Sequence, residues 1–204
     1  MDSKIKTGNK LPEHYDDPVD IFYKKYIDVI NPHFKEAGMT PNMITTLSLL
    51  FGLLTCYLYY KSYYVSAGLS YIVSYFFDVM DGYFARIYDM GSVFGSYYDS
   101  ISDNAVVLIL LILFYKNPNL QFKYKIIIFI LLAVYGIGTA YHMSCQEKYV
   151  KETNEKHVSE GLSFLDNIKC VNFENMKYTR IFGTGVTTFV MSIVIGLHRF
   201  LTNK

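Results

Sequence analysis

Apolar residues in this chain are gathered into five long blocks separated by polar stretches. The blocks fall at residues 43–60, 64–85, 93–115, 125–145 and 181–201. A helix of about 20 residues crosses the hydrocarbon core of a bilayer, and each block reaches or approaches that length. The pattern therefore predicts an all-α fold, a polytopic membrane helix bundle with five clear spans.

A shorter amphipathic pattern precedes the first block, at residues 18–31. One helical face carries the apolar residues Val19, Phe22, Tyr26, Val29 and Ile30. Pro18 suits the start of this helix and Pro32 its end. We expect an amphipathic helix that lies in the membrane interface. A helix packed on a soluble partner is the alternative.

Composition adds few constraints to this pattern. The net charge is +1, which gives no electrostatic case for nucleic-acid binding. Three cysteines (Cys56, Cys145 and Cys170) make no disulfide framework and predict free thiols. Met1 precedes a polar stretch, which predicts no cleavable signal peptide. We expect residues 1–38 to form a polar segment with the interfacial helix, and residues 39–204 to form the membrane domain.

Four aspartates lie at regular steps within the otherwise apolar stretch 78–103. Asp78 and Asp81 are three residues apart and share one helix face, and Asp99 and Asp103 are four apart and share another. A short turn near residue 90 joins the two helices into a hairpin, which brings the carboxylates together. Ionised aspartates in a bilayer are costly, at about 2.5–3.5 kcal/mol each at a helix centre, so they require a cationic partner.

The ligand chemistry of this stretch favours a hard divalent cation. Carboxylate oxygens without nitrogen or sulfur ligands suit Mg²⁺ or Mn²⁺, which share themselves between protein carboxylates and substrate phosphates. Two such ions clamp the attacking and leaving oxygens of a phosphoryl transfer. Gly82, Ala85 and Gly95 leave bare backbone where a flat or bulky ligand can lie close. The five histidines show no metal-ligand spacing.

The same stretch resembles the signature of the CDP-alcohol phosphotransferases, integral membrane enzymes of phospholipid synthesis. Every fixed position is filled in Asp78-x2-Asp81-Gly82-x2-Ala85-Arg86-x8-Gly95-x3-Asp99-x3-Asp103. The resemblance implies six spans, a homodimer and two Mg²⁺ or Mn²⁺ ions. A sixth span at residues 161–178 is left open, because that segment is rich in polar residues.

Roles for individual residues follow from the resemblance. Asp103 matches the general base, and Asp78, Asp81, Asp99 and Asp103 match the metal ligands. The residues that match nucleotide-binding positions are Asn42, Thr45, Gly82, Ala85, Arg86, Ser92 and Gly95. Ordinary helix capping is the alternative for the Pro41-Asn42-x2-Thr45 entry, and snorkelling or pairing with Asp89 is the alternative for Arg86.

The implied reaction transfers a substituted phosphate from a CDP-alcohol to an acceptor alcohol and releases CMP. The donor is CDP-diacylglycerol, or CDP-choline or CDP-ethanolamine. Ser100 and Asn104, which follow the third and fourth motif aspartates, match no branch of the family, so donor and acceptor stay open. Two alternatives stand beside this reading: a membrane cation transporter or channel that uses the aspartates, and an inactive family member that serves as a scaffold.

The distribution of lysine and arginine predicts the orientation. Thirteen of the 19 precede residue 43, lie in the turn 86–92, or lie in the loop 146–180, and all these segments share one side. Positive charge marks the cytoplasmic side, so the aspartate cluster is expected to face the cytoplasm. We expect an integral, multi-pass protein of an ER-like endomembrane in a eukaryote or of the inner membrane in a bacterium.

Overall fold

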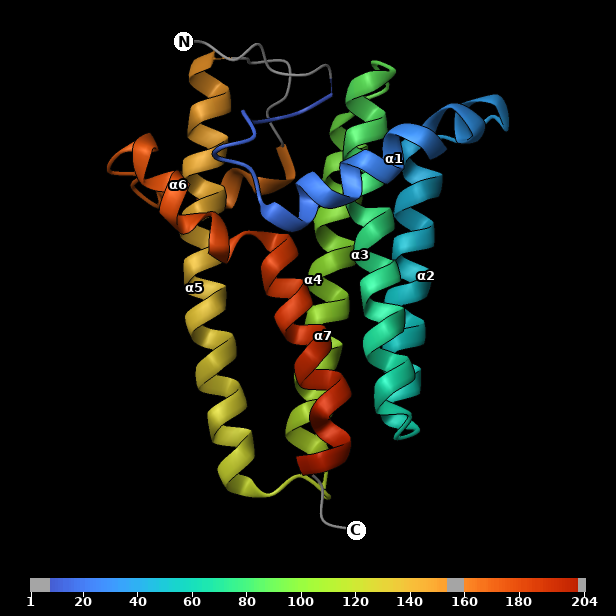
Figure 1. Cartoon of the computed structure of the whole chain (residues 1–204), viewed down its shortest axis with the longest axis vertical. Helices are drawn as coiled ribbons and strands as arrows, with labels where there is room; N and C mark the ends of the chain where they lie inside the picture. Colours follow the sequence, from blue (N-terminus) through green and yellow to red (C-terminus); the bar gives the residue numbers. More distant parts are fainter. Residues whose placement is uncertain (1–7, 154–159, 202–204) are drawn as a thin grey trace.

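The long helices form an up-and-down bundle, and one further helix lies across its end (Figure 1). A computed structural model describes residues 8–153 and 160–201, and it contains no strand over those residues. The crossing helix is α1 (Pro18–Glu36). The bundle consists of α2 (Pro41–Tyr60), α3 (Tyr64–Ile87), α4 (Val93–Lys116), α5 (Phe122–Thr153) and α7 (Thr184–Leu201). The predicted all-α bundle is confirmed, and each of the five apolar blocks is helical.

Among the described residues, four stretches are long and apolar enough to cross a membrane. They are α2, α4, α5 and the stretch Phe173–Leu201, which contains α7. The 24-residue α3 is as long as α4 but is not among them, and it carries Asp78, Asp81 and Arg86. It packs against α2, α7 and α1. These neighbours let a charged helix lie inside an apolar bundle.

Helix α1 begins as predicted but ends later than predicted. The Asp17 carboxylate accepts a hydrogen bond of 2.7 Å from the Val19 amide, with Pro18 at the first helical position. Pro32 lies inside the helix, so the expectation that it ends there is wrong. The helix stops where Gly38 adopts φ of +74° and donates to the Lys35 carbonyl at 3.0 Å. A left-handed glycine stops a helix, whereas an interior proline removes only one hydrogen bond and kinks it.

The two faces of α1 differ in burial, and three of the five residues on the predicted apolar face are exposed. Lys24, Ile27 and Asn31 are buried against the bundle. Phe22, Tyr26 and Val29 are exposed on the outer side. A row of exposed apolar side chains suits a helix in the membrane interface.

No sixth span occupies residues 161–178. Helix α5 continues to Thr153, past its predicted end at residue 145. The chain from residue 160 onward forms short elements: η2 (Glu160–Asn167), η3 (Phe173–Asn175), α6 (Met176–Thr179) and η4 (Arg180–Phe182). None of these four is long enough to cross a bilayer. Residues 154–159 of the polar loop lie outside the described residues.

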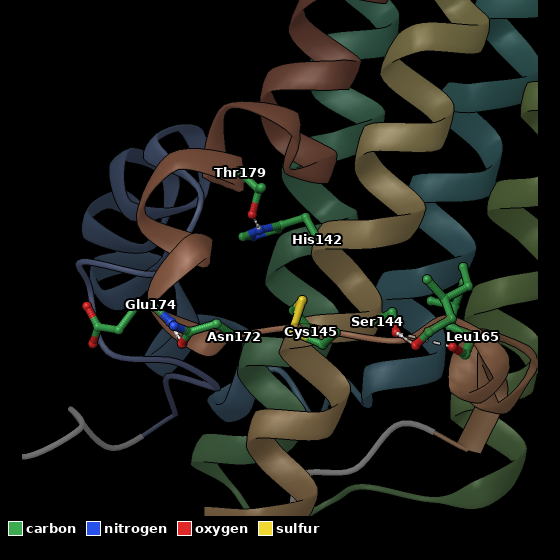
Figure 2. The surroundings of a disulfide bond; sticks show 9 residues. His142, Ser144, Cys145, Leu165, Asn172, Glu174 and Thr179 are labelled. Carbon is green, nitrogen blue, oxygen red and sulfur yellow. Dashed lines mark hydrogen bonds between the residues drawn. A yellow bond between two sulfur atoms is a disulfide. The ribbon is translucent and has the colours of Figure 1, made fainter.

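Cys145 and Cys170 form a disulfide, so the prediction of three free thiols is wrong for these two (Figure 2). Cys56 is free and buried, as predicted. The Ser144 hydroxyl, beside Cys145 on α5, lies 3.2 Å from the Leu165 carbonyl oxygen and 2.7 Å from that of Ile168. The extension of α5 brings the returning chain back onto this helix. The contacts therefore tie the segment around η2 to α5 at the end of the bundle that holds the motif.

Candidate active site

Three of the four motif aspartates converge between α3 and α4. Asp78, Asp99 and Asp103 offer oxygens that all lie within 4.8 Å of one another, and all three side chains are half-buried. The steps of three and four residues set this arrangement, because each pair points from one helix face. The fourth, Asp81, is buried and accepts a hydrogen bond of 2.5 Å from the Thr45 hydroxyl.

The trio fits a divalent cation. Asp99 Oδ1 is buried and has no hydrogen-bond partner, although buried polar atoms are almost always paired. Three carboxylates this close repel one another, and a bound cation removes that repulsion. Their oxygens are the ligands that Mg²⁺ and Mn²⁺ prefer.

A polar cavity of about 420 Å³ opens beside the trio. Its wall includes Asp99 and Asp81 and all seven residues predicted to bind nucleotide, namely Asn42, Thr45, Gly82, Ala85, Arg86, Ser92 and Gly95. The residues come from the start of α2, the end of α3 and the start of α4. The structure thus gathers the predicted set in one place, and its nucleotide-binding role remains a prediction.

Two glycines make room for their neighbours in this wall. A Cβ on Gly95 would lie 2.8 Å from Asn42 Oδ1 and 2.9 Å from the Ser92 hydroxyl. A Cβ on Gly82 would lie 3.2 Å from Arg86 Nη1. Larger residues at either position would displace side chains of the cavity wall. The motif glycines therefore shape the cavity as well as leave backbone bare.

Arg86 folds back over Gly82 and is held by a part of the chain far from the motif. Its Nε donates a hydrogen bond of 2.7 Å to the Gly8 carbonyl. This contact leaves its terminal Nη groups next to Gly82 in the cavity wall. Arg86 therefore lines the cavity with its guanidinium group held in place, and a guanidinium fork can bind a diphosphate.

Several cavity residues were not predicted from the sequence. Those beside the motif are Pro41, Asp89, Met90, Gly91, Val93 and Ser96, and Glu160 joins them from η2. The Gly161 amide donates to the Ser96 hydroxyl at 2.8 Å, which docks this segment on α4. Glu160 follows a long polar loop, and no spacing or periodicity in the sequence links it to the motif.

Tyr97 and Tyr98 stand on α4 near the cavity. Tyr97 is exposed, and the Tyr98 hydroxyl lies 3.1 Å from the Thr46 hydroxyl on α2. Two of the histidines are buried in structural contacts: His142 Nδ1 lies 3.0 Å from the Thr179 hydroxyl, and His198 Nδ1 lies 3.2 Å from the Tyr59 hydroxyl.

Comparison with known proteins agrees with this geometry. The family model of the CDP-alcohol phosphatidyltransferases matches residues 38–198, so the chain belongs to that family. The bundle, its apolar helices and this membership indicate an integral membrane protein.

Two curated relatives match shorter segments. A cardiolipin synthase (CMP-forming)/mitochondrial hydrolase fusion protein of Schizosaccharomyces pombe is 36% identical over 72 residues, covering 35% of this chain and 12% of the relative. An archaetidylinositol phosphate synthase of Pyrococcus horikoshii is 34% identical over 80 residues, covering 39% of this chain and 43% of the relative. The matches thus span less than half of either relative. No solved structure matches the chain significantly.

Proposed function

We propose that this protein transfers a substituted phosphate group from a CDP-alcohol to an acceptor alcohol and releases CMP. One observation carries the proposal: the trio Asp78, Asp99 and Asp103 adjoins a cavity walled by every predicted nucleotide-binding residue. Family membership and the CMP-forming relative support the same chemistry.

The carboxylates divide into two roles in this proposal. Asp78, Asp99 and Asp103 would hold Mg²⁺ or Mn²⁺ together with Asp81, which lies beside them in the cavity wall. When bound, two such ions neutralise the diphosphate and the leaving phosphate. Asp103 also serves as general base and takes the proton from the acceptor hydroxyl.

The donor and the acceptor supply every atom of the products, so the transfer needs no further reactant. The acceptor oxygen forms a bond to the β-phosphorus of the CDP-alcohol as its proton passes to Asp103. The bond between that phosphorus and the bridging oxygen breaks, and CMP leaves with the oxygen. Arg86 binds the diphosphate through its Nη groups, and Gly82 and Gly95 let the nucleotide approach the backbone.

The direct test is CMP release by purified protein with Mg²⁺. CDP-diacylglycerol is offered with inositol, inositol phosphate, serine, glycerol phosphate or phosphatidylglycerol, and CDP-choline or CDP-ethanolamine is offered with diacylglycerol. Release with one pair, lost in Asp103→Asn, supports the proposal and names the substrates. Folded protein that binds Mg²⁺ but releases no CMP with any pair would contradict it.

A cation transporter is the competing function. It needs the carboxylates but has no use for Arg86 and the small residues in the cavity wall. Uptake of Mn²⁺ into proteoliposomes without CMP release would favour the transporter. Folded protein that binds CDP and Mg²⁺ but neither transfers nor transports would point to an inactive scaffold.

Orientation and assembly belong to the same proposal. We place the aspartate end at the cytoplasmic face, because thirteen of the 19 lysine and arginine residues belong to the sequence segments that are predicted to share that side. The resemblance to the family supports a homodimer. Light scattering on the detergent-solubilised protein tests the dimer: a mass twice 23.6 kDa after detergent correction is expected, and a single-chain mass would contradict it.

A further inference from the structure

The segment at residues 8–17, which we call the N-terminal strap, contacts the end of the bundle that holds the candidate active site. It precedes the family match, which begins at residue 38. The strap contacts α3 through Gly8, α5 through Lys10 and η3 through Tyr15, whose hydroxyl donates to Glu174 at 2.7 Å. It is well packed, because Leu11 is only 1% exposed. A segment outside the family match therefore packs against the end of the bundle that holds the candidate active site.

Gly8 fits the strap to α3 in a way that other residues would not. Its φ is +90°, which disfavours residues with a side chain. A Cβ at this position would lie 2.6 Å from Ile87 Cγ1 and 2.9 Å from Tyr83 Cε2. In this conformation the Gly8 carbonyl accepts the hydrogen bond from Arg86 Nε.

A buried ion pair fixes the strap two residues further on. Lys10 pairs with Glu147 on α5, and their side chains are only 9% and 3% exposed. Burial lowers the pKa of Lys10, the Glu147 carboxylate raises it in part, and the charges of Arg86 and Asp99 act on it as well. The charges of two motif residues, Arg86 and Asp99, therefore act on the Lys10 ammonium group.

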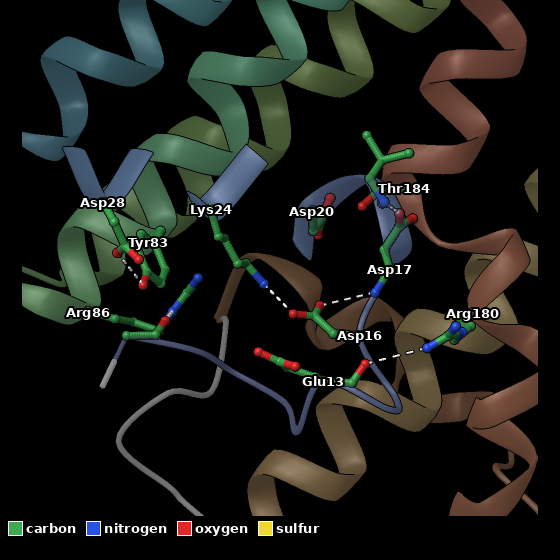
Figure 3. A network of polar contacts seen from close by, with 12 residues as sticks. Glu13, Asp16, Asp17, Asp20, Lys24, Asp28, Tyr83, Arg86, Arg180 and Thr184 are labelled. Carbon is green, nitrogen blue, oxygen red and sulfur yellow. Dashed lines mark hydrogen bonds and ion pairs between the residues drawn. The ribbon is translucent and has the colours of Figure 1, made fainter. Parts of the chain in front are cut away.

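Other contacts hold the strap where α1 begins (Figure 3). Lys24 of α1 donates to Asp16 at 2.5 Å, and the Val186 amide of α7 donates to Asp17 at 3.0 Å. The strap is thus anchored at both ends. The position of Gly8 at its start can therefore influence the position of the Arg86 side chain, to which it is hydrogen-bonded.

We infer that the strap is part of the active site and sets the orientation of Arg86. The Gly8 carbonyl engages Nε, so the two Nη groups are turned to the cavity for the diphosphate, and the Lys10–Glu147 pair holds Gly8 in place. Gly8, Lys10 and Glu147 are positioning residues, because they act through Arg86. This inference rests on the proposed function for the identity of the ligand.

The test measures the KM for the CDP-alcohol and the Kd for CDP with Mg²⁺ in Gly8→Ala, Lys10→Met and Glu147→Gln. Loss of one charged hydrogen bond predicts that both constants rise about tenfold while kcat changes less. Lys151→Met is the matched control, because Lys151 lies on the same helix as Glu147 and forms an exposed 2.6 Å pair with Asp166 of η2. It is expected to leave both constants unchanged.

A cycle with Arg86→Lys separates positioning from mere stability. Lysine lacks the guanidinium fork, so Lys10→Met should add no further rise in KM or Kd once Arg86 is replaced. Effects that multiply in the double variant would overturn the inference, as would unchanged constants in folded Gly8→Ala and Lys10→Met. Glu147→Gln, which keeps a hydrogen-bonding group, serves if Lys10→Met does not fold.

The experiments distinguish a failure of the proposed transfer reaction from a failure of the inference about the strap. If the wild-type protein releases no CMP, the proposed function fails, but the Kd for CDP with Mg²⁺ still reports the coupling between Lys10 and Arg86. If the wild-type protein is active and the strap variants match it in both constants, only the inference about the strap fails.

Discussion

The Thr45 hydroxyl on α2 donates a hydrogen bond of 2.5 Å to the Asp81 carboxylate on α3. Asp81 is thereby held in the cavity wall, beside the trio of aspartates but outside it. Outer hydrogen bonds of this kind orient carboxylates toward a bound metal, and their loss typically lowers metal affinity about 10- to 100-fold.

Thr45→Val is therefore expected to weaken Mn²⁺ binding by about tenfold or more. Titration of the purified protein, followed by calorimetry or by the resonance of free Mn²⁺, measures this affinity. Thr55→Val is the control, because its buried hydroxyl donates only along its own helix, to the Phe51 carbonyl at 2.9 Å. Equal affinities in the wild type and Thr45→Val would show that Asp81 needs no such support.

Asp103→Asn is expected to reduce turnover by about 10²-fold or more, because a general base contributes roughly 10²–10⁴. Binding of CDP with Mg²⁺ should survive largely intact, since Asp78, Asp81 and Asp99 remain. Asp78→Asn serves as the contrast and should weaken binding of Mg²⁺ as well as turnover. Undiminished turnover in Asp103→Asn would remove Asp103 as the base.

Gly95→Ala is expected to raise the KM for the donor about tenfold by forcing Asn42 and Ser92 out of the cavity wall. The cause is the short approach of a Cβ to Asn42 Oδ1, at 2.8 Å. Gly136→Ala on α5 is the matched control, because nothing lies within 4 Å of a Cβ there. Steady-state kinetics measures the KM for the donor in both variants. An unchanged KM in Gly95→Ala would mean that Asn42 does not contact the donor.

Removal of the Cys145–Cys170 disulfide is expected to destabilise the protein by about 2–4 kcal/mol, because the bond closes a loop of moderate length. Thermal unfolding in detergent measures this as a lower Tm for the wild type in the presence of dithiothreitol. The variant with Cys145→Ser and Cys170→Ser should have that lower Tm without reductant and show no response to it. If dithiothreitol also lowered the Tm of that variant, the effect of the reductant on the wild type would not be due to this disulfide.

The raised pKa of Asp20 predicts that the protein loses stability as pH rises. The pKa of Asp20 is raised to about 7, mainly by burial and also by the charges of Asp17 and Asp16, whereas Lys24 and the 2.6 Å hydrogen bond from Tyr75 lower it in part. The folded state therefore retains a proton on Asp20 between about pH 4 and pH 7 that the unfolded state has released. Stability due to this group is greatest at low pH and falls as pH rises through that window.

Asp20→Asn should remove this contribution. The expected result is a Tm that falls less between pH 5 and pH 8 in the variant than in the wild type. Comparison of the two slopes cancels the titration of groups that both proteins share. Parallel slopes would show that Asp20 is ionised throughout the range.

The sequence by itself determined the local parts of the site. The steps between Asp78 and Asp81 and between Asp99 and Asp103 fix which helix face each side chain leaves, because an α-helix has a constant period. Pro18 similarly predicted the start of α1, where it occupies the first helical position. Such features depend on neighbours within one or two turns, so the amino-acid order is sufficient.

Only the tertiary structure decided the contacts between distant segments. The Gly8–Arg86 hydrogen bond, the Cys145–Cys170 disulfide and the place of Glu160 in the cavity each join residues from separate elements. Helical periodicity states which face is apolar but not which neighbour covers it, so these pairings carry no local signal. The end of α1 shows the same limit, because packing carried the helix past Pro32 until the left-handed Gly38 stopped it.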